Sequence, residues 1–244
     1  MINIVIPMAG AGSRFSLAGY KEPKPFIDVL GKPMIQWVIE NLTTKFTHRF
    51  ILICQREHLN ESDFATSLGR ICENFEVIPI DGLTQGAAET VLFAAELIDN
   101  DDSLIIANSD QYIEYKFEKF IHSLIQKKSD GCILTMASDS PKWSYLKFND
   151  EFCVTEVREK EVISEEATVG IYGFAKGADF VRGAKKMISD NSRVNGEFYV
   201  APVYNELIKE GRKIFFENIG SENNQMNGLG TPEDLSFFIR KMQT

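Results

Sequence analysis

MINIVIPMAGAGSRF, residues 1–15, opens the 244-residue chain with an apolar run that leads into a glycine-containing loop. The β-branched run at residues 2–6 predicts a buried parallel strand that ends at Pro7. Open α/β sheets bind ligands at the carboxyl ends of their strands. Gly10 and Gly12 allow backbone conformations that other residues avoid, and they let N–H groups approach a phosphate closely. Residues 8–14 are therefore a candidate anion-binding loop.

Basic side chains lie at the end of this loop and just after it. Arg14 carries a guanidinium that can bind two phosphate oxygens, and Lys21 and Lys24 lie in a proline-containing segment just beyond it. Together with the loop they would form a polyphosphate site. The alternative is a glycine turn between a strand and a helix. Phe15 stands where a dinucleotide fingerprint needs its third glycine, and the Gly-Lys-Ser/Thr ending of a P-loop is absent.

Two segments of the opening region carry a family pattern. Residues 7–15 read PMAGAGSRF and residues 23–35 read PKPFIDVLGKPMI. They resemble the N-terminal signature of the sugar-phosphate nucleotidyltransferases, roughly LAGGxGTRL and then KxxLPVxxKPMI, with departures at Pro7, Met8 and Ala9. The resemblance implies that these residues contact the nucleotide phosphates: Met8, Ala9, Gly10, Ala11, Gly12, Ser13, Arg14 and Lys24.

The same resemblance, which later motifs extend over most of the chain, implies an α/β fold. We expect a Rossmann-like mixed, mostly parallel sheet flanked by helices, with a small antiparallel β extension on the acceptor side. One domain is expected over residues 1–244, with a nucleotide-binding half at 1–137 and an acceptor-binding half with a C-terminal helix at 138–244. The helices predicted from periodicity include residues 59–72, 87–97, 117–128 and 195–209.

Composition limits the classes of function. The formal net charge is -9 and no long basic run is present, which argues against a nucleic-acid binder. No apolar run reaches the roughly 18 residues of a spanning helix, and no signal-like stretch follows a basic segment, so we expect a cytoplasmic protein without membrane contact. The four cysteines lack C-x-x-C spacing, which disfavours a metal knuckle and favours reduced core cysteines.

Gln85 is the candidate base reader. It follows a predicted strand in the loop Gly-Leu-Thr-Gln-Gly, and its amide can donate and accept hydrogen bonds, as reading a pyrimidine edge requires. The small residues at 86–88 would let a flat base lie against the helix start. The alternative is a polar residue near a helix cap. The resemblance implies nucleotide contacts by Gln85 and Gly86, because the family has a Gln-Gly segment here.

Asp110 is the candidate metal ligand. The apolar run at residues 103–107 predicts a buried strand that leads into Asn108, Ser109 and Asp110. A carboxylate at this strand end would face the same crevice as the glycine loop and could hold a divalent cation. The alternative is an aspartate that caps a turn. The resemblance implies a metal-binding role for Asp110, with Mg²⁺ or alternatively Mn²⁺, and a nucleotide contact at Ser109.

The candidate acceptor site lies in the region from residue 141 to 174, whose short alternating strands predict the antiparallel extension. The family has a Glu-Lys pair ahead of a Gly-x-Tyr motif, in which the lysine meets the acceptor phosphate and the glutamate its hydroxyls. A solvated, charge-rich hairpin is the alternative, and Glu156 competes with Glu159 for the role. The matching residues implied by the resemblance are Glu159, Lys160, Gly170 and Tyr172.

The C-terminal quarter adds one candidate contact and one departure. Glu197 follows Gly196 at the start of a predicted helix, where it is either an acceptor contact, as the resemblance implies, or an acid at a helix N-terminus. The family often places a second metal-binding aspartate two residues before a Gly-Thr-Pro motif, and here that position is Gly228. Asp234 is expected to serve the first turn of the last helix. One metal ion centred on Asp110 is therefore expected.

The resemblance implies a reaction that joins a nucleoside triphosphate to a phosphorylated acceptor and releases pyrophosphate. The nucleophile is already an anion and needs no catalytic base, which suits a chain with three histidines. Catalysis would then depend on positioning and on neutralising charge. The implied catalytic residues are Arg14, on the β- and γ-phosphates, Lys24, on the α-phosphate and leaving oxygen, and Asp110, with Lys160 on the acceptor.

Three other classes of protein are alternatives to this one. A glycosyltransferase would want an Asp-x-Asp motif, and residues 108–110 supply only one aspartate in that frame. A non-catalytic regulatory subunit of the same fold would retain Arg14, Lys24 and Asp110 without need. A Rossmann oxidoreductase is disfavoured by Phe15.

The identity of both substrates stays open. The IPMAGxGSRF opening with the GLGTPEDL ending looks most like family members from bacterial capsule-synthesis clusters, which implies CTP, UTP or dTTP with a sugar 1-phosphate. A related member uses CTP with phosphoglutamine to make a precursor of capsule phosphoramidate, so the acceptor need not be a sugar. The oligomeric state is not predicted.

Overall fold

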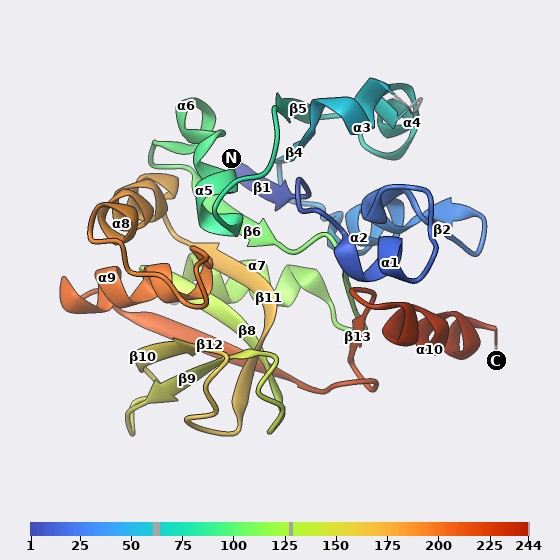
Figure 1. The fold of residues 1–244 in the computed structure, drawn as a ribbon. Coiled ribbons are helices and arrows are strands. Elements are labelled where there is room, and N and C mark those ends of the chain that lie inside the picture. Colours follow the sequence, from blue (N-terminus) through green and yellow to red (C-terminus); the bar gives the residue numbers. More distant parts are fainter. Residues whose placement is uncertain (61–63, 127–128, 244) are drawn as a thin grey trace.

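A mixed β-sheet runs through the computed structural model, which describes residues 1–60, 64–126 and 129–243 (Figure 1). Its main path has the order β10-β9-β11-β6-β1-β4-β5, and β8 pairs with β11 and β12. β1, β4, β5 and β6 run parallel to one another, whereas β11 runs antiparallel to β6, β8 and β9. The strands are β1 (Ile2–Pro7), β4 (His48–Gln55), β5 (Phe75–Ile80), β6 (Ser103–Ala107), β8 (Gly131–Ala137), β9 (Ser144–Phe148), β10 (Val154–Glu159), β11 (Glu166–Phe174) and β12 (Ile214–Ser221).

Helices cover both faces of this sheet, as the burial of β1 on both sides requires. Ile4 and Ile6 contribute to one core cluster and Val5 to the other, because successive side chains of a strand point to opposite faces. The first cluster includes side chains of α2 (Met34–Leu42), α4 (Phe64–Ile71) and α7 (Phe117–Gln126). The second includes side chains of α5 (Ala87–Leu92), α6 (Ala95–Ile98), α8 (Gly177–Ser189) and α9 (Tyr204–Lys209). The predicted fold class is confirmed.

A third cluster joins the two ends of the chain. Phe15 of α1 (Ser13–Leu17) packs with Leu235 and Phe238 of α10 (Pro232–Met242), beside the N-terminal loop (Figure 1). The pairing of β7 (Gln111–Ile113) with β13 (Met226–Gly228) places the C-terminal segment next to the residues that follow β6. Leu229 N–H donates to the Asp110 carbonyl at 2.7 Å. The remaining short elements are β2 (Asp28–Val29), β3 (Lys32–Pro33), α3 (Arg56–Asn60) and two 3₁₀ turns (Lys24–Phe26, Ala201–Val203).

Two predicted helices differ from the structure. The helix expected at 87–97 is interrupted between α5 and α6. The helix expected at 195–209 is confirmed only in its last part, α9, and its predicted start is wrong. Asn195 and Gly196 form a turn with positive φ, and Val194 bridges to Glu197. Glu197 is therefore not an acid in the first turn of a helix. Parts of the helices expected at 59–72 and 117–128 lie outside the described residues.

The sheet contains strands from both predicted halves, residues 1–137 and 138–244, so the two halves share one hydrogen-bonded network. The division into two functional halves stays a prediction. Within the described ranges, no helix is long and apolar enough to cross a membrane. All four cysteines are free, and burial raises the pKa of both Cys54 and Cys72 to about 11.

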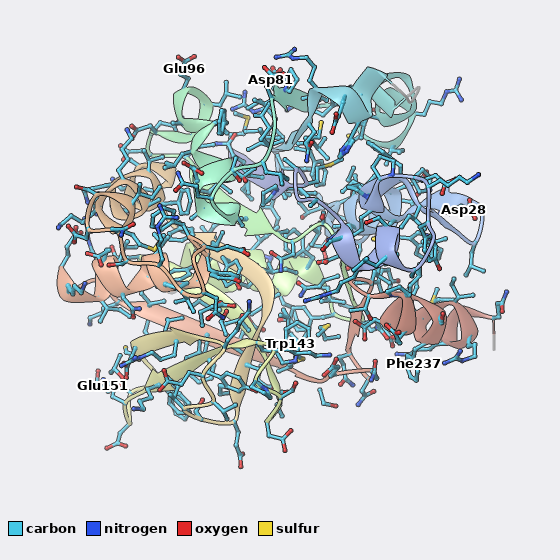
Figure 2. The ribbon with its side chains drawn as sticks, in the orientation of Figure 1. Asp28, Asp81, Glu96, Trp143, Glu151 and Phe237 are labelled. Atoms are coloured by element: carbon cyan, nitrogen blue, oxygen red, sulfur yellow. The ribbon has the colours of Figure 1, made fainter. Side chains whose placement is uncertain are left out.

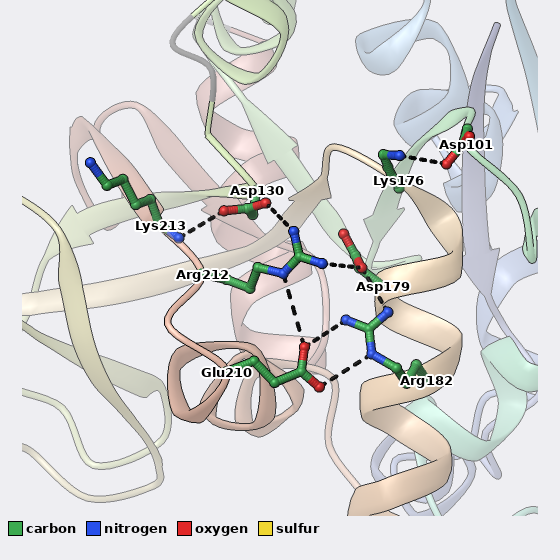
Figure 3. A network of polar contacts seen from close by, with 8 residues as sticks. All are labelled: Asp101, Asp130, Lys176, Asp179, Arg182, Glu210, Arg212 and Lys213. Atoms are coloured by element: carbon green, nitrogen blue, oxygen red, sulfur yellow. Dashed lines mark hydrogen bonds and ion pairs between the residues drawn. The ribbon is translucent and has the colours of Figure 1, made fainter.

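A polar network ties α8 to the turn after α9 (Figure 3). Asp179 has a side chain only 4% exposed and accepts a hydrogen bond from Arg182 Nη1 at 2.8 Å. Arg182 also binds both carboxylate oxygens of Glu210, and Arg212 lies 3.6 Å from Asp179. The negative charge of the buried Asp179 carboxylate is thus balanced by two arginines.

The Arg182→Ala variant is expected to lose about 1–3 kcal/mol of unfolding free energy, because a buried carboxylate loses its nearest charged donor. Urea denaturation would measure this loss. Lys186→Ala on the same helix is the control, since the exposed Lys186–Asp190 pair should cost about 0.5 kcal/mol or less. Equal losses in the two variants would contradict the role given to Arg182.

Candidate active site

Three adjoining pockets lie at the carboxyl ends of β1 and β6. The loop pocket, of about 330 Å³, lies between residues 7–11 and residues 83–90. The hairpin pocket, of about 320 Å³, lies over β11 and residues 142–144. The aspartate pocket, of about 330 Å³, lies between Asp110 and the start of α10. The loop and hairpin pockets share Ala87 and Glu197, and the hairpin and aspartate pockets share Arg14, Asn108, Gln111, Lys142 and Trp143.

The glycine loop forms one wall of the loop pocket, as the sequence predicts. Its position is held by Gln55, whose Nε2 donates to the Ala9 carbonyl at 2.8 Å, and by the bond from Met8 N–H to Ile53 at 2.8 Å. Gly12 caps α1 with φ 61°, and a Cβ there would lie 3.2 Å from Lys24 Cβ. The predicted phosphate residues that line this pocket are Met8, Ala9, Gly10, Ala11 and Lys24; Gly12 and Ser13 stand beyond its edge.

Lys24 and Asp110 meet at the junction of the pockets. Lys24 Nζ donates to Asp110 Oδ2 at 2.7 Å, and both side chains are about one-fifth exposed, at 22% and 21%. The 3₁₀ turn at Lys24–Phe26 presents the lysine, and the end of β6 presents the aspartate. Arg14 lines the hairpin and aspartate pockets. Ser109 lines the loop pocket. The three predicted catalytic residues are thus brought together from distant parts of the chain.

The aspartate pocket fits a divalent cation through its donor chemistry and its space. Asp110 and Asp234 both line it. Gly230 leaves room beside Asp110, where a Cβ would lie 2.8 Å from Oδ2, and Gly228 leaves room 3.5 Å from Asp234 Oδ2. Mg²⁺ takes few carboxylates and keeps waters and phosphate oxygens as its other ligands. Within the described ranges, no group of three or more His, Cys, Asp or Glu side chains is placed to hold a metal.

The sequence predicts only a role in the first turn of α10 for Asp234, whereas the structure also places it at the aspartate pocket. Its backbone N–H donates to Thr231 Oγ1 at 3.1 Å in the first turn of α10, as predicted. Its carboxylate also lines the pocket that contains Asp110. The β7–β13 pairing, which periodicity did not reveal, produces this approach.

Gln85 is not among the residues that line the loop pocket, although its neighbours Thr84 and Gly86 line it. Its Nε2 donates to Glu89 Oε1 at 3.1 Å, and its Oε1 accepts a hydrogen bond from Arg193 Nη2. Base reading by the Gln85 side chain therefore stays a prediction. The sequence contained no signal for the contact with Arg193.

The hairpin pocket collects the predicted acceptor residues. Lys160 Nζ donates to Tyr199 Oη at 2.5 Å, and Ser144 Oγ donates to Glu159. Glu156 instead pairs with Arg158 and is not among the lining residues, so the geometry favours Glu159 of the two candidates. The predicted residues that line this pocket are Glu159, Lys160, Gly170, Tyr172 and Glu197.

Several lining residues were missed by the sequence. Gln111 is 7% exposed, and within the described part of the chain its Oε1 has no hydrogen-bond partner. Trp143 Nε1 is likewise buried and unpartnered, and the indole lies between the antiparallel strands and α10 (Figure 2). The position of Gln111 directly after Asp110 is the signal that could have identified it. The other missed residues of the hairpin pocket are Asn108, Lys142, Ser144, Thr168, Tyr199 and Val200.

Burial raises the pKa of Glu159 above its ordinary value of 4.5, and this effect outweighs the Ser144 hydrogen bond and the Lys160 charge, which lower it. The folded protein therefore holds this proton more tightly than the unfolded chain. The contribution of Glu159 to stability is present below its ordinary pKa and declines as the pH rises through the raised pKa.

The Glu159→Gln variant should lack this decline, so its stability relative to the wild type should improve as the pH rises above about 4.5. Denaturant midpoints measured between about pH 4 and pH 8 test this. Parallel pH profiles for the two proteins would contradict it.

The chain is similar in sequence and in structure to known proteins. A family profile described as nucleotidyl transferase matches residues 4–200. The bifunctional protein GlmU of Methanocaldococcus jannaschii is 24% identical over all of this chain and 56% of its own length, so the chain spans about half of that relative. The nucleoside-diphosphate-sugar pyrophosphorylase of Vibrio cholerae RC9 superimposes with a TM-score of 0.80 at 26% identity, covering 97% and 99% of the two chains. The inositol-1-phosphate CTP transferase of T. maritima shares the fold, with a TM-score of 0.76 at 12% identity over 98% and 94% of the chains.

Proposed function

Because this chain belongs to the nucleotidyl transferase family, we propose that it transfers a nucleoside monophosphate from a nucleoside triphosphate to a phosphorylated small molecule and releases pyrophosphate. The observation that carries the proposal is the Lys24–Asp110 pair: Lys24 lines the loop pocket, and Asp110 lines the aspartate pocket, which shares Arg14 with the hairpin pocket. A triphosphate on one side and an acceptor on the other would meet at these residues.

In the proposed reaction an oxygen of the acceptor phosphate attacks the α-phosphorus in line. One P–O bond forms to the acceptor, and the bond to the β-phosphate oxygen breaks, so pyrophosphate leaves with the bonding electrons. The attacking oxygen is an anion and no proton must be removed. The barrier comes mainly from bringing anions together, which positioned cations and amides lower.

The residues of the three pockets are assigned the following roles. Lys24 would turn from Asp110 to the α-phosphate and the leaving oxygen, and Arg14 with the loop amides would hold the outer phosphates. Lys160 would bind the acceptor phosphate, while Glu159 and Glu197 accept hydrogen bonds from its other groups. Asp110, with Asp234 beside it, would hold Mg²⁺, which when bound neutralises phosphate charge.

The substrates form the finer part of the proposal. CTP, UTP or dTTP is the donor, and a sugar 1-phosphate is the first choice of acceptor. The product would serve capsule or surface polysaccharide synthesis. The polar hairpin pocket, with its carboxylates and hydroxyls, supports a hydroxyl-rich acceptor. A non-sugar phosphate such as phosphoglutamine is the second choice, supported by the opening and closing motifs of the sequence.

A pyrophosphate-release assay tests this function. Each of the four ribonucleoside triphosphates and dTTP is combined, with Mg²⁺, with a panel of sugar 1-phosphates and phosphorylated amides. We expect pyrophosphate from one donor and acceptor combination. Release of free nucleoside diphosphate from a nucleotide sugar, supplied in place of the triphosphate, would instead indicate a glycosyltransferase. Failure of every triphosphate to bind would favour a non-catalytic subunit.

A further inference from the structure

Residues 191–199, here called the connecting loop, lie between the loop pocket and the hairpin pocket. Glu197 lines both pockets, and Tyr199 lines the hairpin pocket. This loop replaces the predicted start of a helix, and Asn191, Asn195 and Gly196 adopt positive φ values within it. A conformational change at the loop pocket can therefore be transmitted through residues 197–199 to the hairpin pocket.

Backbone contacts tie the connecting loop to the segment that forms the wall of the loop pocket. Phe198 N–H donates to the Gln85 carbonyl at 2.8 Å, and Ala88 N–H donates to the Phe198 carbonyl at 3.0 Å. Gly86, with φ 134°, lies so close that a Cβ would stand 2.5 Å from the Phe198 backbone. The two segments thus pack as one unit.

Arg193 adds side-chain contacts to this unit. Its Nε donates to Asn191 Oδ1 at 2.6 Å and its Nη1 to the Gly196 carbonyl at 3.0 Å, which holds the connecting loop in shape. Its Nη2 donates to Gln85 Oε1, and its guanidinium lies 4.0 Å from the centroid of the Phe198 ring. A planar guanidinium can make all four contacts at once, whereas an ammonium group cannot.

The other end of the connecting loop reaches the acceptor side. Lys160 Nζ donates to Tyr199 Oη and lies 4.7 Å from the centroid of its ring. Lys160 has φ 57°, and its backbone N–H donates to the Trp143 carbonyl at 2.9 Å. A continuous series of contacts therefore runs from Gln85 through Arg193 and the connecting loop to Lys160.

We propose that Arg193 is a positioning residue that couples the two substrate pockets, so that a nucleotide in the loop pocket orders Lys160 and the acceptor side. This rests on the proposed function, because it takes the loop pocket as the nucleotide site. Nucleotide binding at residues 83–90 steadies the segment that Arg193 holds. The connecting loop then loses motion, and Tyr199 holds the Lys160 ammonium in place before the acceptor arrives. Coupling of this kind raises the affinity for the second ligand.

Hydrogen–deuterium exchange tests the coupling without a known acceptor. The probes are Mg²⁺ with CTP, UTP, dTTP, ATP or GTP, added singly to wild type, Arg193→Ala and Arg193→Lys. In the wild type the bound nucleotide should slow exchange at residues 8–14 and also at residues 155–162, which include the Lys160 amide. Both variants should keep the first effect and lose the second. Arg158→Ala is the control, since Arg158 pairs with Glu156 and Glu161 and should leave both effects intact.

The possible results distinguish a failure of the proposed function from a failure of the coupling through Arg193. Absence of slowing at residues 8–14 with every triphosphate would overturn the proposed function and the coupling with it. Slowing at residues 8–14 alone in the wild type would overturn only the coupling. Equal slowing at residues 155–162 in wild type and Arg193→Ala would overturn the role of Arg193. A thermal melt of each variant checks that it is folded. Once an acceptor is known, Arg193→Ala should raise its KM by about tenfold while kcat changes less.

Discussion

Lys24→Ala and Asp110→Ala should each lower the rate of pyrophosphate release by about 10²–10³-fold, because each removes charge stabilisation at the reacting phosphorus. Both residues are partly exposed at the pocket junction, and neither belongs to the described hydrophobic clusters. The fold should therefore survive either change. Turnover is measured at saturating substrates, and circular dichroism with thermal melting verifies folding.

Two control variants change the same residue types outside the pockets. Lys32→Ala removes an exposed lysine from the same segment, one that pairs with Glu40 instead of a pocket residue. Asp28→Ala removes an exposed aspartate whose Oδ1 accepts from Gly31 N–H. Both should retain near-normal turnover. Near-normal turnover in purified Lys24→Ala or Asp110→Ala would remove that residue from the mechanism.

The second large effect is expected at Gly170. Its φ of 77° disfavours any L side chain by about 1–2 kcal/mol, and a Cβ there would overlap the side chains of Asn108 and Gln111. Overpacking of this kind costs about 1–3 kcal/mol more. Gly170→Ala should therefore lower the unfolding free energy and displace two residues that line the hairpin pocket. The KM for the acceptor should rise together with the loss of stability.

Gly31→Ala is the control for the backbone term. Gly31 has a similar φ of 83°, but nothing lies within 4 Å of the position its Cβ would take. Urea denaturation of the two variants separates strain from overlap. If Gly170→Ala costs no more than Gly31→Ala, the crowding of Asn108 and Gln111 against Gly170 does not matter to stability.

The central parallel strands and the loops at their carboxyl ends could be predicted, because the local sequence specifies them. The apolar runs at residues 2–6 and 103–107 must be covered on both faces, and they became adjacent parallel strands of the sheet. Since the carboxyl ends of parallel strands meet at one edge, the glycine loop and Asp110 had to approach each other. The 2.7 Å contact between Lys24 and Asp110 follows from that geometry together with the proline-flanked turn at Lys24.

The segments that were predicted wrongly are held by contacts with residues far away in the sequence. Periodicity favoured a helix from residue 195, but Gly196 and the pairing of Phe198 with residues 85–88 hold that segment in a turn. The loop around Gln85 suggested a base reader, whereas Arg193, more than a hundred residues away, binds its side-chain oxygen. Neither partner is visible in the sequence surrounding the other.

The sequence by itself determined the alternation of strands and helices, the glycine loop at the end of β1 and the position of Asp110 at the end of β6. These features depend on periodicity and on the backbone freedom of glycine, which are properties of neighbouring residues. Only the tertiary structure decided that Glu159 and not Glu156 lines the hairpin pocket, that Asp234 lines the same pocket as Asp110, and that Arg193 binds the Gln85 side chain. The β9–β10 register and the β7–β13 pairing set the first two placements, and the backbone bonds between Phe198 and residues 85–88 set the third. Register is fixed by contacts across the whole fold.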